Sequence, residues 1–185
     1  MSTKQIEKSA IEIQIPKDVK VNLKGSMLQV QGPLGKVYKN FKKIPVLIQI
    51  NDNKILLTRT GERKKHQAIF NTAKSLIQTL CIGVIDGFTI KMKIVYSHFP
   101  VTVKVDGKKV LIENFQGEKA NRITRIWGES KVTPKGDDLI ITGHVLTDVT
   151  QTAAEIQDGT KVKNKDHRVF LDGIYKYFKA KGIEA

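Results

Sequence analysis

Residues able to bind anions dominate the chemistry available to this sequence. Lys and Arg number 32 against 18 Asp and Glu in 185 residues, which gives a formal net charge of +14. A protein of this charge attracts polyanions, of which nucleic acid is the commonest and an anionic membrane surface the second. The arginines are few: Arg59, Arg63, Arg122, Arg125 and Arg168. Because Lys acts as a mobile point charge toward phosphates, whereas Arg reads base edges, this composition favours contact with a nucleic-acid backbone over sequence reading.

The densest cationic segment of the second half spans residues 161–168 and reads KVKNKDHR. It continues into VFLDGIYKYFK, so that cations and aromatic rings are interleaved. Such interleaving suits phosphate contact combined with stacking on exposed bases. In the alternative interpretation, Phe170, Leu171 and Ile174 belong to the core and only the lysines face outward. We expect each interpretation to hold for different residues, and we expect residues 176–185 to become ordered only when bound.

A second cationic cluster occupies residues 63–66, at the start of a predicted helix in the first half. Cations at a helix N-terminus oppose the helix dipole, at a cost of roughly 0.3–1 kcal/mol each when exposed. An external anion would relieve that cost, and a solvated basic turn explains the cluster equally well. Both interpretations stay open for this segment.

Groups that would carry catalysis or bind a metal show no usable spacing. The four histidines are isolated from one another, and the single cysteine, Cys81, falls on the apolar face of a predicted helix, where it acts as a small hydrophobe. The GPLGK segment at residues 32–36 is shorter than a Walker A motif, and Val37 replaces the Ser or Thr that holds magnesium. We therefore predict a protein that is not an enzyme and has no catalytic residue, metal or cofactor.

The elements that position the cationic residues follow from hydrophobic periodicity and from turn residues. Alternation of apolar and polar residues predicts strands in both halves. The predicted strands are residues 11–15, 19–23, 27–31, 44–50 and 54–58, then 101–105, 110–112, 122–127 and 139–142. A helix follows the strands in each half. The first covers residues 62–82 with Gly83 as its C-terminal cap, and the second is capped by Thr147 and Asp148.

The two halves also share landmarks at a nearly constant separation. The recurring pairs, 84, 82 and 86 positions apart, are Pro16 and Pro100, Gly35 and Gly117, and the Asp-Gly pairs at 86–87 and 172–173. An offset of this length indicates a duplicated domain. We therefore predict an α+β fold of two tandem, similar modules, residues 1–87 and 88–185. In each module an antiparallel or mixed β-sheet packs against one α-helix, and the second module carries the basic C-terminal segment.

Cysteine usage and hydropathy predict a soluble, intracellular protein. One cysteine excludes an internal disulfide and suits a reducing compartment. The first twelve residues mix polar and apolar side chains, without the continuous hydrophobic region of a signal peptide. The most apolar run, residues 80–85, is too short to span a bilayer.

Three segments of the chain resemble a known family. They are KMKIVYSHFP at residues 91–100, NFQGEK at 114–119 and VKNKDHRVFLDGIY at 162–175. They resemble the universal large-subunit ribosomal protein L-six family, most closely its eukaryotic cytosolic branch, called L-nine, and the resemblance covers nearly the whole chain. It implies two similar domains, each a sheet packed with a helix. It also implies a structural, rRNA-binding role in the large (60S) ribosomal subunit and in cytoplasmic translation.

The resemblance further implies a location and a set of contacts. Members of the family lie near the sarcin–ricin loop and the base of the lateral stalk. The implied partners are large-subunit rRNA and neighbouring large-subunit proteins, including those of the stalk base, with no membrane and no small-molecule substrate. The implied compartment is the cytosolic ribosome, after assembly through the nucleolus. The rRNA-binding residues carried over are Lys161, Lys163, Asn164, Lys165, Arg168 and Tyr175, followed by Lys119 and Arg122. The alternative is a protein that binds nucleic acid or a membrane outside the ribosome.

Overall fold

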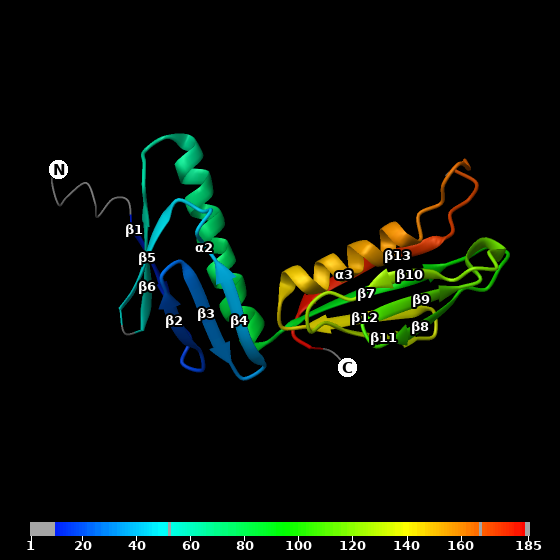
Figure 1. The fold of residues 1–185 in the computed structure, drawn as a ribbon, viewed down its shortest axis with the longest axis horizontal. Coiled ribbons are helices and arrows are strands. Elements are labelled where there is room, and N and C mark those ends of the chain that lie inside the picture. The colour runs from blue at the N-terminus through cyan, green and yellow to red at the C-terminus, as the bar shows by residue number, and fades with distance from the viewer. Residues whose placement is uncertain (1–9, 52, 167, 184–185) are drawn as a thin grey trace. The chain divides into compact units, whose positions relative to one another are not determined.

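The computed structural model describes residues 10–51, 53–166 and 168–183. These residues form two compact units, one ending at Ile85 and the other beginning at Asp86 (Figure 1). The boundary that the sequence predicts, after residue 87, stands two residues further along the chain. Within the described residues each unit consists of antiparallel strands and one long helix, so the predicted α+β class is confirmed.

The first unit contains two three-stranded sheets and helix α2, Lys64–Ile85. Its strands are β1 Ala10–Gln14, β2 Lys20–Lys24, β3 Met27–Gly32, β4 Gly35–Asn40, β5 Val46–Asn51 and β6 Lys54–Arg59. The strands run in the order β1-β6-β5 in one sheet and β2-β3-β4 in the other. Helix α2 packs against strands of both sheets. The core between them includes Leu28, Val30, Ile55, Leu57 and Ile77, which are fully buried.

Helix α2 runs further than predicted. Gly83 is not its cap but a buried residue within it, and the helix continues to Ile85. Just after the end of α2, the residue with left-handed backbone is Gly87, with φ of 75°. A side chain on Gly32 of β3 would lie 2.7 Å from Val84, so the last turn of α2 packs closely on the sheet and is held there. Burial raises the pKa of the Cys81 thiol on this helix, in keeping with its predicted role as a small hydrophobe.

By length and composition alone, α2 could also cross a membrane. Its buried residues are Phe70, Ala73, Ile77, Cys81, Gly83 and Val84, which recur on one face. A core helix of a globular protein meets the same criterion of length and apolar composition. The packing of this face in the first unit is that of a core helix.

The second unit repeats the pattern around helix α3, Leu146–Gly159. Its strands are β7 Phe88–Val95, β8 Thr102–Asp106, β9 Lys109–Glu113, β10 Arg122–Arg125, β11 Lys131–Lys135, β12 Asp138–Gly143 and β13 Gly173–Lys181. A short 3₁₀ helix, η1, covers Phe115–Gly117. The sheet orders are β10-β9-β8 and β11-β12-β7-β13. One core cluster joins both sheets and α3, with Met92, Ile112, Leu139 and Ile156 fully buried.

Two expectations for the second unit are wrong. Residues 176–181 are not a tail that waits for a partner, because they form most of β13 and pair antiparallel with β7, with a register shift between Lys176 and Phe178. The helix is not capped by Thr147 and Asp148. Helix α3 begins at Leu146 after Val145, which has extended backbone and makes no side-chain capping hydrogen bond.

The sheet orders confirm that the fold is duplicated. Strands β5-β6-β1 of the first unit correspond to β11-β12-β7 of the second, and β2-β3-β4 correspond to β8-β9-β10. Lys54 begins β6 and Asp138 begins β12, which is 84 positions later; Lys20 begins β2 and Thr102 begins β8, which is 82 positions later. In the first unit, no described strand corresponds to β13.

Candidate nucleic-acid interface

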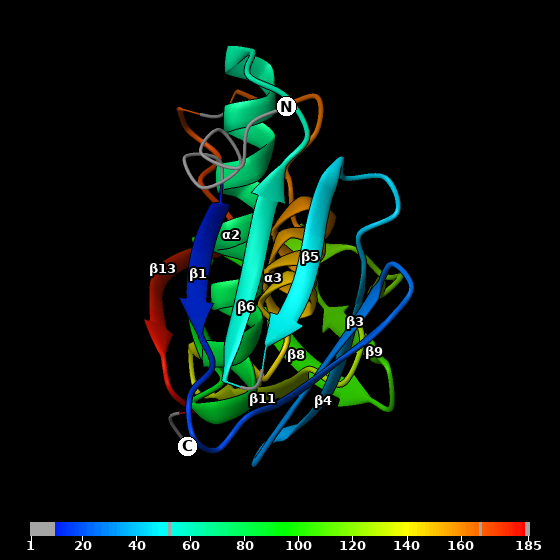
Figure 2. The same ribbon diagram turned by 90° about the vertical axis from the view of Figure 1, so that its left-hand side faces the viewer.

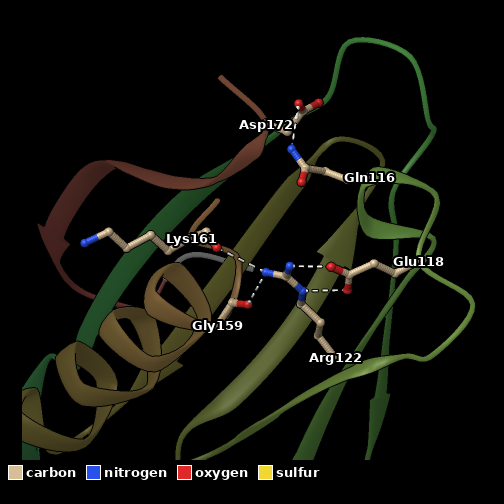
Figure 3. Close-up of polar contacts among 6 residues, drawn as sticks. All are labelled: Gln116, Glu118, Arg122, Gly159, Lys161 and Asp172. Atoms are coloured by element: carbon tan, nitrogen blue, oxygen red, sulfur yellow. Dashed lines mark hydrogen bonds and ion pairs between the residues drawn. The ribbon is translucent and has the colours of Figure 1, made fainter. Parts of the chain in front are cut away.

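Three loops meet at one end of the second unit. They are the β7–β8 connection, the segment between β9 and β10, and the long connection between α3 and β13 that contains the cationic segment. The buried carboxylate of Asp172 joins all three, because it accepts a hydrogen bond from the backbone N–H of Ser97 at 2.8 Å. It accepts a second from the Gln116 side chain at 3.4 Å, which Figure 3 shows. Asp172 therefore fixes the end of the long loop against the other two.

The segment between β9 and β10 is held in a sparsely populated backbone conformation. Asn114 and Gln116 have φ of 57° and 53°, and Gly117 has φ of 76°. Left-handed backbone at a residue other than glycine costs on the order of 1 kcal/mol and persists only where the surroundings enforce it. Phe115, which is 1% exposed, anchors the turn in the core. The result is that Gln116 reaches Asp172.

Arg122 on β10 braces the start of the cationic loop. Its guanidinium donates two hydrogen bonds to the Glu118 carboxylate, at 2.8 and 2.6 Å. It donates two more to the carbonyl oxygens of Gly159 and Lys161, at 3.0 and 3.2 Å (Figure 3). The same group lies 4.2 Å from the centre of the Phe115 ring. Because the Arg122 guanidinium makes all these contacts inside the protein, we assign Arg122 the role of positioning the cationic loop.

The positive charges near Glu118 lower the pKa of its carboxylate. Hydrogen bonds from Arg122 are the largest cause that holds the pKa of Glu118 below its ordinary range, and the positive charge of Lys165 adds to the effect. The glutamate therefore stays ionised over the physiological range, and its charge is opposed by two neighbouring cations.

The lysines of the loop point outward while the residue between two of them is buried. Val162 is 3% exposed, whereas Lys161, Lys163, Asn164 and Lys165 are all exposed. The Lys161 side chain extends away from Arg122, although its carbonyl oxygen accepts the hydrogen bond from that residue (Figure 3). The lysines of this segment are therefore exposed on the surface of the loop, while the buried side chain of Val162 attaches the loop to the core.

Aromatic rings lie next to these cations, as the sequence predicts. The Lys165 ammonium is 4.5 Å from the centre of the half-buried Phe170 ring. Tyr175 is 43% exposed, and its hydroxyl lies 3.2 Å from the carbonyl oxygen of Leu171, to which it donates. Leu171 is exposed and Ile174 is buried in the core, so each of the two interpretations of this segment holds for part of it.

Arg168 and Lys119 complete the predicted set. Lys119 is exposed between β9 and β10. Arg168 is also exposed, and it forms an ion pair with Asp166 at 2.8 Å whose hydrogen bond raises the pKa of the arginine. An anion binding at Arg168 therefore competes with Asp166 for the guanidinium. His167, which belongs to the same segment, lies outside the described residues.

A pocket of about 170 Å³ opens between the three loops. It is lined by Ser97, His98, Phe99, Gln116, Lys165, Val169, Phe170 and Asp172. Phe99 and Val169 are 49% and 68% exposed, so apolar surface adjoins the cations here. Sequence reasoning did not single out Asp172, Gln116 or Phe99 as parts of the site. The Asn-Phe-Gln-Gly run was a usable signal for a tight turn, but nothing in the spacing links it to Asp172.

Among the residues that the structure describes, no group of His, Cys, Asp and Glu is arranged to hold a metal ion. What the loops offer is positive charge, planar rings and exposed apolar surface on a rigid support. Two copies of one α+β module, the second ending in this surface, define the class as a binding protein whose surface is complementary to a polyanion.

Comparison with known proteins identifies the family. The family model for ribosomal protein L6 matches residues 99–173. The large ribosomal subunit protein uL6 of Methanosarcina mazei is 41% identical over 175 residues, which cover 95% of this chain and 99% of the relative. Large ribosomal subunit protein uL6 of Staphylothermus marinus is 44% identical over 171 residues, covering 90% and 92%. That of Thermoplasma volcanium is 44% identical over 163 residues, covering 88% and 92%.

The chain belongs to the uL6 family of large ribosomal subunit proteins. This confirms the resemblance to the universal family and the predicted place in translation, and it makes the protein a component of the ribosome with a structural rather than a catalytic role. The relatives named here are archaeal, so the assignment to the eukaryotic branch stays a prediction.

Proposed function

We propose that this protein binds large-subunit rRNA through the loop between α3 and β13. The observation that carries the proposal is that Lys161, Lys163 and Lys165 are all exposed on this loop. The rings of Phe170 and Tyr175 lie in the same segment, with the Lys165 ammonium over Phe170 and the Tyr175 hydroxyl hydrogen-bonded to the loop backbone. Cations neutralise phosphates, and the adjoining rings offer planar surfaces to unpaired bases. Asn164 and Arg168 extend this surface, and Lys119 adds a cation from the neighbouring segment.

We further propose where this contact lies. As expected for the family, the loop faces rRNA near the sarcin–ricin loop, and the protein lies beside the proteins at the base of the stalk. The cytosolic 60S subunit is the proposed particle, with assembly through the nucleolus. Arg122 is proposed to act indirectly, by holding the loop in the conformation that meets the RNA.

The test is binding of the full chain to a fragment of large-subunit rRNA. In the variant with Lys163→Glu, Lys165→Glu and Arg168→Glu, three contacts become repulsive, so we expect binding to fall below detection. The matched control carries Lys108→Glu, Lys109→Glu and Lys131→Glu, which are exposed in the β8–β9 turn, at the start of β9 and at the start of β11. Both variants have the same net charge, so we expect the control to retain binding. Equal affinities for the two variants would refute the site.

Sedimentation places the chain in the particle or outside it. We expect the protein to co-migrate with large ribosomal subunits on a sucrose gradient after a high-salt wash. A pool that sediments slowly and is absent from the particle would instead support a nucleic-acid-binding protein outside the ribosome.

A further inference from the structure

The two units differ at one edge of one sheet. In the first unit Ile13 of β1 pairs with Ile55 of β6. Leu139, which is 84 positions after Ile55, pairs in β12 with Met92 of β7, so β1 and β7 are equivalent strands. In the second unit β13 covers the outer edge of β7. In the first unit, no described strand covers the outer edge of β1, which lies at the margin of its sheet in front of α2 (Figure 2).

Strand β13, which pairs with the outer edge of β7, shows which contacts hold a strand at this edge of the sheet. β13 runs antiparallel to β7 from Gly173 to Lys181. It inserts Ile174, which is 1% exposed, into the core beside α3. The N–H of Ile174 donates to the Thr160 hydroxyl at the end of the helix, at 3.1 Å. The remaining residues of β13 are mostly exposed, so the strand is held largely by backbone pairing and one buried side chain.

At the corresponding place in the first unit, the space between β1 and α2 is a groove of about 490 Å³. It is lined by Glu12, Ile13, Gln14, Pro16, Lys74, Gln78, Cys81 and Ile82. Ile13 and Cys81 make the floor of the groove apolar, and no strand among the described residues pairs with the outer edge of β1 beside it, so that edge can accept a further strand. A groove flanked by a free sheet edge is the arrangement in which proteins bind an extended peptide.

We propose that the outer edge of β1 binds an extended segment of a neighbouring protein of the large subunit, as an added antiparallel strand. The repeat supports this occupant, since the chain itself supplies a strand of this kind at the equivalent edge. Nucleic acid cannot form the alternating N–H and C=O ladder that an edge strand accepts. The inserted segment needs one apolar side chain that enters the groove beside Ile13 and Cys81, as Ile174 of β13 enters the core beside α3. This inference rests on the proposed place of the chain in the large subunit.

The test is site-specific photocrosslinking within assembled large subunits. Gln78 is exposed and lines the groove, so it is replaced with p-benzoylphenylalanine. Ser75, exposed on the same helix outside the groove lining, is replaced in the control. We expect the probe at position 78 to crosslink to one segment of another subunit protein, and the control to crosslink less to that segment. Crosslinks only to rRNA, only to this chain or a second copy of it, or no crosslink above the control, would overturn the proposal.

A synthetic peptide of the crosslinked segment then provides an equilibrium measurement. We expect it to bind the isolated full chain, and Gln78→Trp, which fills the groove, to weaken binding at least about tenfold. The control Ser75→Trp leaves the affinity within about twofold. Equal affinities for the two variants would overturn the proposal even if crosslinks form.

Failure of this inference is separable from failure of the proposed function. Sedimentation of the probe-bearing chain is measured in the same preparation. Assembly into the subunit without a protein crosslink at position 78 counts against the added strand alone. Absence of the chain from the subunit counts against the proposed function.

Discussion

The guanidinium of Arg122 donates hydrogen bonds to a carboxylate and to two carbonyl oxygens, and it lies over an aromatic ring. An arginine so engaged joins the end of α3 to the segment between β9 and β10. The neighbouring Lys161, Lys163 and Lys165 are exposed, and the Lys165 ammonium lies over the Phe170 ring. At the scale of single residues, the site therefore contains one cation that organises the loop and several that are available to an anion.

We expect Arg122→Ala to destabilise the second unit by roughly 1.5–3 kcal/mol, because hydrogen bonds to a charged group are lost and two carbonyl oxygens lose a donor. Arg122→Lys should recover only part of this, since an ammonium cannot reproduce the planar fork. Denaturant unfolding of the full chain measures both. An unchanged free energy of unfolding combined with weaker rRNA binding would show instead that Arg122 contacts the RNA.

At the scale of elements, the turns between strands help to position the candidate interface, as the strands do. Gly107 and Gly117 both have positive φ, of 54° and 76°, and both connect neighbouring segments of the second unit. They differ in their surroundings. A side chain at Gly107 would meet open space, whereas one at Gly117 would lie 3.1 Å from the Phe99 ring at the candidate interface.

We expect Gly107→Ala and Gly117→Ala each to cost about 1–2 kcal/mol in stability, through left-handed backbone strain. Only Gly117→Ala should displace Phe99 and weaken rRNA binding, because only that turn adjoins the cationic loop. Unfolding curves, the NMR signals of the Phe99 ring and rRNA affinities measure the difference. Equal losses of affinity in both variants would mean that strain, and not the position of Phe99, controls binding.

Sequence periodicity predicted strands where one face is buried and the other is exposed. It missed β4, in which Val37 is the one buried residue, and β13, whose residues after Ile174 are mostly exposed. It also missed β7, although Phe88, Ile90, Met92 and Ile94 alternate there with Thr89, Lys91 and Lys93. Backbone pairing holds an edge strand without requiring an apolar pattern, so such strands leave little trace in the sequence.

At the scale of the whole molecule, net charge does not locate the interface. Residues 1–87 carry 15 basic and 6 acidic residues, a net charge of +9, and residues 88–185 carry 17 and 12, a net charge of +5. The cationic loop with adjoining rings nevertheless lies in the less charged half. Total charge promotes encounter with any polyanion, whereas a binding site also needs cations held in a fixed arrangement.

We expect rRNA affinity to fall linearly with salt on logarithmic axes, since each phosphate contact releases counterions. Lys163→Gln should reduce the slope by roughly 0.7–0.9, the contribution of one phosphate contact. Lys108→Gln, which removes an equal charge from the β8–β9 turn, should leave the slope nearly unchanged. Titrations over a range of salt concentrations measure both slopes, and equal reductions would indicate a diffuse electrostatic attraction in place of a defined site.

The sequence by itself determined the α+β class, the duplication and the cationic loop, because periodicity, repeated turns and charge are local properties of the chain. The resemblance to the ribosomal protein family could likewise be inferred from three segments of the sequence, residues 91–100, 114–119 and 162–175. Only the tertiary structure decided that Asp172 joins three loops, that Arg122 braces the loop and that β13 completes one sheet while β1 keeps an open edge among the described strands. These depend on contacts between residues far apart in the chain, such as Ser97 with Asp172, which no local pattern specifies.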